Sequence, residues 1–273
     1  MQAAPLLAAR YGLLIGLLGE SATGKTCLLS SLYLLASCGE LQPAFQFAGS
    51  ATLPGFERRI RLLREWSGAT LPETISEHTI LTDERQPGLL HLALRSNEVA
   101  SARDLLLTDL PGEWTTDLVR RADKASRLAF FRRADVVVIA LSGPDLATDE
   151  TRNRQIQFSR MLVQRLRDAV GVDLETPIIF AVTRCDMIGT IAPAAIYRIV
   201  DAATDFGFKD VSYTLVAAFS DRSDIPSGLG VPELLSKVFR KRDPHFYSRD
   251  RDQNANNRAF ASFVAAGDPS EST

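Results

Sequence analysis

One eight-residue segment near the start of the chain has the composition and spacing of a phosphate-binding loop. It reads G-E-S-A-T-G-K-T and fits the pattern G-x-x-x-x-G-K-[ST]. Its two glycines allow the backbone to curl so that successive N–H groups face phosphate oxygens. We expect Lys25 to reach the terminal phosphates and the Thr26 hydroxyl to ligate Mg²⁺. The predicted phosphate-binding residues are Gly19, Glu20, Ser21, Ala22, Thr23, Gly24, Lys25, Thr26 and Cys27.

The sequence on either side of this loop has the order that the motif requires. Residues 11–18 form a short apolar run, which suits a buried parallel strand. Residues 27–35 are apolar over a longer stretch, which suits a buried helix. The positive end of that helix would add to the anion site. The flanks therefore support a true phosphate-binding loop over a glycine-rich turn.

A second segment, D-L-P-G, follows the apolar residues 105–108. An aspartate at the end of a strand beside the phosphate loop can hold Mg²⁺ through water. We therefore expect Asp109 to be a metal ligand. Gly112 offers a backbone N–H to a γ-phosphate, and Glu113 follows it directly. Lys25, Gly112 and Glu113 are the predicted catalytic residues.

A third segment, T-R-C-D, follows the buried apolar run 178–182. It matches the pattern [NT]-K-x-D that reads guanine, with Arg184 in place of lysine. Asp186 would accept hydrogen bonds from the guanine N1–H and exocyclic amine, a donor pair that adenine lacks. The aliphatic stem of Arg184 would cover the base, and Thr183 would complete the segment. The base is therefore predicted to be guanine.

The composition is that of a globular protein of 273 residues with 45% hydrophobic residues and a net charge of −2. This balance gives no reason to expect nucleic acid or an acidic membrane as a partner. Three cysteines at unrelated spacings favour a reducing, cytoplasmic setting. The three histidines lack metal-ligand spacing, and we expect them at the surface or in loops. We read the apolar start as the first strand, with no targeting segment and no membrane span.

Apolar runs alternate with helical patterns along the chain. The pattern predicts an α/β fold of the P-loop NTPase type, a six-stranded, mainly parallel sheet with helices on both faces and one antiparallel edge strand. The antiparallel strand comes from a hairpin. The later strands are expected at 89–94, 105–108, 136–141, 178–182 and 213–218, and the later helices at 116–131, 149–170, 191–206 and 232–240.

The predicted nucleotide-binding domain spans residues 1–242, with an insert at about 42–86, and a polar, flexible tail follows at 243–273. Within the insert, residues 56–66 form a basic amphipathic pattern. Two interpretations are open for this helix. It packs an apolar stripe on the domain, or it is a partner-binding or regulatory insert.

The order of these motifs resembles a Ras-like small GTPase of the TRAFAC class over about residues 12–240. It is similar in particular to bacterial TRAFAC-clade and double-GTPase proteins, on the insert before the second strand and the D-x-x-G-E segment. The resemblance implies GTP or GDP with Mg²⁺ as cofactors. It also implies a protein partner that reads the switch state, with a second GTPase or a GTPase-activating protein as candidates.

The sequence departs from the Ras pattern at several positions. Glu113 stands where the family commonly has a catalytic glutamine, and Ser21 and Ala22 stand where Ras often has glycines. A carboxylate would repel the γ-phosphate, and bulkier loop side chains obstruct an inserted arginine. The last guanine motif is degenerate. Its best match places Ala218 and Phe219 at the base.

Three functions are therefore carried forward. The leading one is a GTP-binding switch that hydrolyses GTP slowly. The second is a nucleotide-loaded interaction module with negligible hydrolysis, and the third, less favoured, is an ATP-using P-loop enzyme, which leaves the T-R-C-D segment unexplained. The switch I threonine is left open between Thr74, Thr79 and Thr82.

Overall fold

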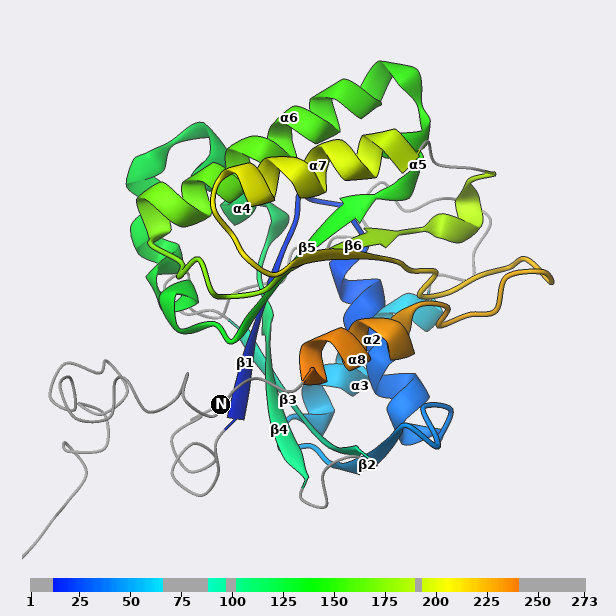
Figure 1. Ribbon diagram of the computed structural model, residues 1–273. Coiled ribbons are helices and arrows are strands. Elements are labelled where there is room, and N and C mark those ends of the chain that lie inside the picture. Colours follow the sequence, from blue (N-terminus) through cyan, green and yellow to red (C-terminus); the bar gives the residue numbers. More distant parts are fainter. Residues whose placement is uncertain (1–11, 66–87, 97–101, 190–192, 241–273) are drawn as a thin grey trace, which may run out of the picture.

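The computed structural model describes residues 12–65, 88–96, 102–189 and 193–240. Within these residues, seven strands form one sheet in the order β2-β3-β4-β1-β5-β6-β7 (Figure 1). The strands are β1 Gly12–Leu18, β2 Phe45–Gly49, β3 Gly88–Ser96, β4 Arg103–Asp109, β5 Val136–Ser142, β6 Ile178–Thr183 and β7 Val211–Leu215.

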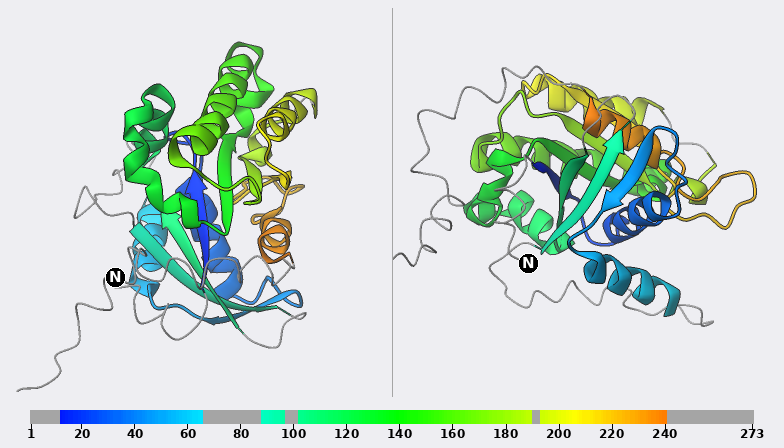
Figure 2. Two further views of the ribbon diagram at one scale, coloured as in Figure 1. Left: turned by 60° about the vertical axis from the view of Figure 1, so that its left-hand side comes forward. Right: turned by 90° about the horizontal axis from the view of Figure 1, so that it is seen from below.

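Helices cover both faces of this sheet (Figures 1 and 2). One face carries α2, α3 and α8, and the other carries α4, α6 and α7. The helices are α2 Lys25–Ser37, α3 Leu53–Glu65, α4 Gly112–Arg120, α5 Gly143–Ala147, α6 Asp149–Arg165, α7 Pro193–Asp205 and α8 Val231–Phe239, with shorter helical segments η1 Ala122–Arg133, η2 Leu166–Val170 and η3 Cys185–Met187.

The central strands are apolar throughout because they are buried on both sides. Every residue of β5 and β6 is buried. Val136 and Val138 belong to the core on the α2 side, whereas Val137 and Ile139 belong to the core on the α6 side. This strand alternation explains why the sequence shows continuous apolar runs rather than a polar–apolar pattern.

The predicted fold class is confirmed, and the strand count differs by one. The additional strand is β2, which pairs antiparallel with β3 at the edge of the sheet. The expected antiparallel strand is β3, which opposes β4 with Leu90 across from Leu107. It is second from the edge because β2 lies outside it. β2 spans five residues, and of its side chains only Phe45 is buried, so its sequence signal is weak.

The basic helix of the predicted insert, α3, packs on the helix that follows the phosphate loop. The Phe56 ring is fully buried and stacks on Tyr33 of α2, with ring centroids 4.8 Å apart. The Tyr33 hydroxyl donates a hydrogen bond to Glu57 Oε1 at 2.9 Å. Ile60 is also buried. The structure therefore shows apolar packing by the first two turns of this helix, whereas the rest of the predicted stripe lies outside the described side chains and a regulatory role stays a prediction.

One histidine contradicts the expectation of surface or loop positions. His91 lies inside β3 with 4% of its surface exposed. Its Nδ1 accepts a hydrogen bond from the Ala51 N–H at 2.8 Å, so the ring proton is on Nε2, which lies 2.9 Å from Asp104 Oδ1. The ring is structural, because it joins two strands to the segment before α3. His78 and His245 lie outside the described residues.

Two predicted helices are split. The pattern at 116–131 becomes α4, which ends at Arg120, followed by the 3₁₀ segment η1. The long pattern at 149–170 becomes α6 and a terminal π turn, η2, closed by Gly171 in the left-handed conformation. Among the described helices, none combines the length and apolar character needed to cross a membrane.

Candidate nucleotide-binding site

The phosphate loop joins the end of β1 to the start of α2. Gly19 has φ +150° and Gly24 has φ +81°, backbone conformations that side chains disfavour. A Cβ on Gly19 would lie 2.7 Å from the Ala140 carbonyl oxygen, so no other residue fits. α2 begins directly after Gly24, and the Leu28 N–H donates to the Gly24 carbonyl at 2.9 Å. The loop therefore presents a helix N-terminus.

Lys25 lies inside the loop and is buried, with 7% of its surface exposed. Its Nζ donates to the carbonyl oxygens of Gly19 at 2.8 Å and Glu20 at 2.7 Å. Burial lowers the pKa of Lys25 to about 8, an effect that the negative charges of Asp109, Glu113 and Glu20 oppose. The ammonium is thus held by loop carbonyls at the place where phosphates are expected.

This lowered pKa predicts a pH-dependent affinity. Phosphates bind the charged ammonium, so above about pH 8 the free protein must take up a proton when it binds a nucleotide. Affinity should then fall as pH rises, by up to about tenfold per unit. Titration of a fluorescent nucleotide between about pH 7 and 9 measures this slope. Lys25→Arg, whose guanidinium stays charged, should flatten it, and an equal slope in both proteins would contradict the assignment.

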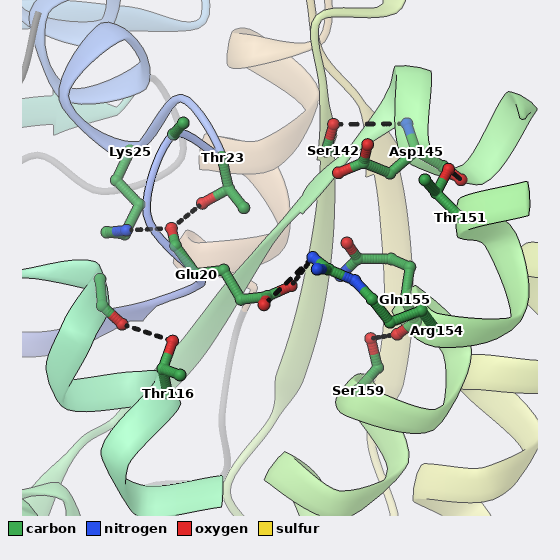
Figure 3. A network of polar contacts seen from close by, with 12 residues as sticks. Glu20, Thr23, Lys25, Thr116, Ser142, Asp145, Thr151, Arg154, Gln155 and Ser159 are labelled. Atoms are coloured by element: carbon green, nitrogen blue, oxygen red, sulfur yellow. Dashed lines mark hydrogen bonds and ion pairs between the residues drawn. The ribbon is translucent and has the colours of Figure 1, made fainter. Parts of the chain in front are cut away.

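Glu20 directs its carboxylate away from Lys25 and toward α6 (Figure 3). Arg154 Nη2 lies 3.3 Å from both carboxylate oxygens of Glu20. The ion pair is partly solvated, because the Arg154 side chain is 67% exposed, and its contribution to stability is small. Its effect is positional, since an acidic side chain turned into the phosphate loop would repel a nucleotide. Glu20 can therefore serve the loop through its backbone.

The D-x-x-G segment packs directly on the phosphate loop. A Cβ on Gly112 would lie 2.2 Å from the Ser21 backbone nitrogen, a distance that no side chain can occupy. Thr115, in the first turns of α4, accepts a hydrogen bond from the Gly19 N–H at 3.3 Å through its Oγ1. Glu113 is exposed in the first turn of α4. The structure brings this segment and the phosphate loop together.

Asp109 has a partner that the sequence analysis did not identify. Its side chain is 3% exposed, and its Oδ2 accepts a hydrogen bond from Arg59 Nε at 2.8 Å. Arg59 Nη2 contacts the same oxygen. Arg59 belongs to α3, and nothing in the local pattern separates it from the other arginines of that helix. Its contact depends on the fold, which brings residues 50 positions apart together.

The residues proposed for Mg²⁺ are hard oxygen donors of the kind that this ion prefers. Thr26 is exposed at the start of α2, and Asp109 is at the end of β4. Across the described residues there is no cluster of three or more His, Cys, Asp or Glu side chains suited to a metal. An ion held by Thr26 and Asp109 would take its other ligands from phosphates and water.

The T-R-C-D segment is tied to the phosphate loop from the other side. Thr183 Oγ1 lies 2.7 Å from the Thr23 carbonyl and 3.0 Å from the Leu141 carbonyl, and its single proton serves one of them at a time. Arg184 has φ +56°, and its Nη2 donates to the Ala22 carbonyl at 2.8 Å and to Ser142 Oγ at 3.0 Å. The Arg184 guanidinium therefore links the phosphate loop to the end of β5.

One carboxylate oxygen of Asp186 suits a role in binding a ligand. Its Oδ1 is buried and has no hydrogen-bond partner among the described residues. Arg184 Nε is in the same condition. Buried polar atoms without partners are costly and uncommon in native proteins. A guanine base would offer Asp186 two N–H donors, so the residue present fits the expected base.

The second segment predicted to contact the base, Ala218 and Phe219, lies beside the T-R-C-D segment. The Cys185 N–H donates to the Val216 carbonyl at 3.2 Å, which holds the chain after β7 against η3. Ala218 is buried, and Phe219 is 40% exposed.

Burial raises the pKa of the Cys27 thiol in the first turn of α2, so Cys27 is an inert part of the site. The three candidate switch I threonines lie outside the described residues.

Comparison with known proteins gives a family match and several structural likenesses. Residues 13–239 match the family model Double-GTPase 2. A GTP-binding protein from the archaeon Sulfolobus solfataricus, solved with GDP, is 14% identical with a TM-score of 0.45, over 86% of this chain and 54% of that one. A bacterial selenocysteine-specific elongation factor is 13% identical with a TM-score of 0.44, over 84% and 28% of the two chains.

A third structure, the signal recognition particle receptor SRb-GTP/SRX complex from Chaetomium thermophilum, is 16% identical with a TM-score of 0.41, over 78% of this chain and 94% of that one. At these identities and scores, none of the three decides the function. The chain spans 54% of the archaeal protein and 28% of the elongation factor. No curated protein matches significantly. Because the family match covers most of its length, the chain belongs to the Double-GTPase 2 family of GTP-binding P-loop proteins.

Proposed function

We propose that the protein is a cytoplasmic GTP-binding switch that binds GTP and GDP with Mg²⁺, hydrolyses GTP slowly and signals to a protein partner. The observation that carries the proposal is the buried, unpartnered Oδ1 of Asp186, beside a loop that holds a charged lysine. The first feature suits a base with two adjacent N–H donors. The second suits phosphates. Their combination favours a guanine nucleotide over other P-loop ligands.

Each proposed binding residue has a distinct task. Lys25 and the N–H groups of the loop would hold the phosphates, and Thr26 and Asp109 would hold Mg²⁺, which neutralises phosphate charge when bound. Gly112 contacts the loop at Ser21, so a change in the terminal phosphate would be transmitted to α4. That coupling is the proposed switch.

GTP affinity measured against ATP affinity tests the proposal directly. The expected result is a preference for GTP of at least about a hundredfold, because ATP would leave Asp186 unpaired. Fluorescent GDP, displaced in turn by unlabelled GTP and ATP, provides the measurement. Equal displacement by the two nucleotides would exclude guanine recognition and favour an ATP-using enzyme.

A second candidate is a nucleotide-loaded interaction module with negligible hydrolysis. It is favoured by Glu113. The negative charge of this residue is close enough to Lys25 to oppose partly the lowering of the Lys25 pKa, and it would also repel a γ-phosphate. Single-turnover hydrolysis of bound GTP, alone and with candidate activating proteins or a second GTPase, separates the two. A rate that no partner raises would support the module.

Glu113→Gln tests the hydrolytic role of this position. We expect wild-type turnover on the order of 10⁻⁴–10⁻³ s⁻¹ or lower, and an equal or faster rate in the variant, because the carboxamide can orient water without repelling phosphate. Phosphate release in a single turnover measures the rate, and GTP affinity should be equal or higher, because the repelling charge is removed. Asp117→Asn on the same helix is the control. Collapse of hydrolysis with GTP affinity intact would instead make Glu113 a catalytic residue.

A further inference from the structure

The ion pair between α3 and β4 occupies a carboxylate that the proposed function assigns to Mg²⁺. Arg59 places two of its donors, Nε and Nη2, on a single oxygen of Asp109. Both partners are largely buried, with side-chain exposures of 16% and 3%. The attraction between two buried charges is screened less than that between surface charges, and removing one partner leaves a costly unpaired charge. Asp109 is therefore neutralised by the chain itself.

The position of Arg59 is fixed by the packing of its helix. Its third nitrogen, Nη1, donates to the Gly55 carbonyl one turn earlier at 2.7 Å. Gly55 lies against Leu90 of β3, where a Cβ would come within 3.0 Å of the leucine side chain. Phe56 and Ile60, on either side of Arg59 in the helix, are buried in the core. The guanidinium is thus held at Asp109 by the scaffold.

We propose that Arg59 is the resident counter-ion of Asp109 and competes with Mg²⁺ for it. The inference rests on the proposed function for the identity of the metal site. A unit positive charge in contact with the carboxylate repels a divalent cation at the same group. The arginine also stabilises the carboxylate when no metal is bound, because an unpaired buried Asp109 would be costly.

The competition makes metal binding depend on the phosphates. Mg²⁺ alone meets the full repulsion of Arg59. Mg²⁺ with a nucleotide brings negative phosphate oxygens to the site, and these offer the guanidinium another partner. Metal and nucleotide would therefore bind with positive coupling, and each would raise the affinity of the site for the other. In this arrangement the insert that carries α3 sets the metal dependence of the switch.

The test uses Arg59→Gln in the full chain, with Arg58→Gln as the control. Arg58 lies on the same helix and is exposed. The first measurement is the Mg²⁺ concentration that half-suppresses release of fluorescent GDP. Removing the competing charge should lower this concentration by at least about tenfold in Arg59→Gln and leave it unchanged in Arg58→Gln. An equal or higher concentration in Arg59→Gln would overturn the proposal.

The second measurement uses nucleotide-free protein and Mg²⁺ alone. The Tm of Arg59→Gln should rise more on addition of Mg²⁺ than the Tm of the wild type, because the unpaired Asp109 gains the ion as its partner. An equal rise would overturn the proposal. This Tm measurement does not depend on GDP. If the protein binds no guanine nucleotide, the proposed function is contradicted, and the Tm measurement still tests the role of Arg59. If Arg59→Gln does not fold, Arg59→Met, which also removes the charge, replaces it, and the same shifts are expected.

Discussion

Replacing Asp186 with asparagine should reverse the base preference of the site. The variant should bind GTP and GDP at least about a hundredfold more weakly, because its carboxamide cannot accept from two guanine donors. Xanthine has an oxygen where guanine has its amine, and the asparagine NH₂ can donate to it. Xanthosine diphosphate should therefore bind the variant more tightly than GDP does. Competition binding to both proteins, with fluorescent nucleotide displaced by unlabelled GDP or xanthosine diphosphate, measures this change of base preference.

A matched control for this experiment is Asp221→Asn. Asp221 is exposed in the loop after β7 and has no assigned role in binding the base. Its substitution should leave both affinities unchanged. A variant at Asp186 that binds GDP as tightly as the wild type would show that the buried Oδ1 faces some other group, and the guanine assignment would be withdrawn.

Lys25→Ala should nearly abolish nucleotide binding, with a loss of at least about a hundredfold, because a charge-assisted contact with the phosphates is removed. Thr26→Asn should act differently. It removes the proposed Mg²⁺ ligand, so GTP affinity should fall more than GDP affinity. Isothermal titration with each nucleotide, with and without Mg²⁺, separates the two effects.

The control for charge is Lys209→Ala, since Lys209 is exposed and pairs with Glu175. Its affinity should match the wild type. Because Lys25 is buried, circular dichroism must first show that the alanine variant is folded. Unchanged binding in folded Lys25→Ala and Thr26→Asn proteins would remove the phosphate-loop assignment.

The sequence was most informative where chemistry and local structure coincide. The phosphate loop needs glycines at defined places, a strand before it and a helix after it, and each leaves a mark within a few residues. β5 and β6 are continuous apolar runs because they are buried on both faces, so their positions could be predicted. The order of the three nucleotide motifs along the chain could also be read from the sequence. The sheet topology brings these motifs to one end of the sheet.

The features that were missed depend on contacts between distant segments. β2 is short and mostly exposed, so its sequence carries little of the period that identifies a strand. His91 is expected at the surface or in a loop, and its burial is explained by two partners from other segments, Asp104 on the neighbouring strand and the Ala51 N–H. Arg59 could be placed on a helix, but the direction of its side chain depends on how that helix packs. The limits of the domain, the insert and the tail stay predictions.

The contacts from β6 to the phosphate loop have a consequence for how binding energy is distributed. Thr183 and Arg184 hold the Thr23 and Ala22 carbonyls through direct hydrogen bonds within the chain. The two halves of the site are thus joined by the fold itself, so a nucleotide that binds across them should lose little affinity to ordering them. The same rigidity makes them interdependent. A substitution in the base-reading segment should disturb phosphate contacts as well, so double-mutant cycles between Arg184 and Lys25 should be strongly non-additive.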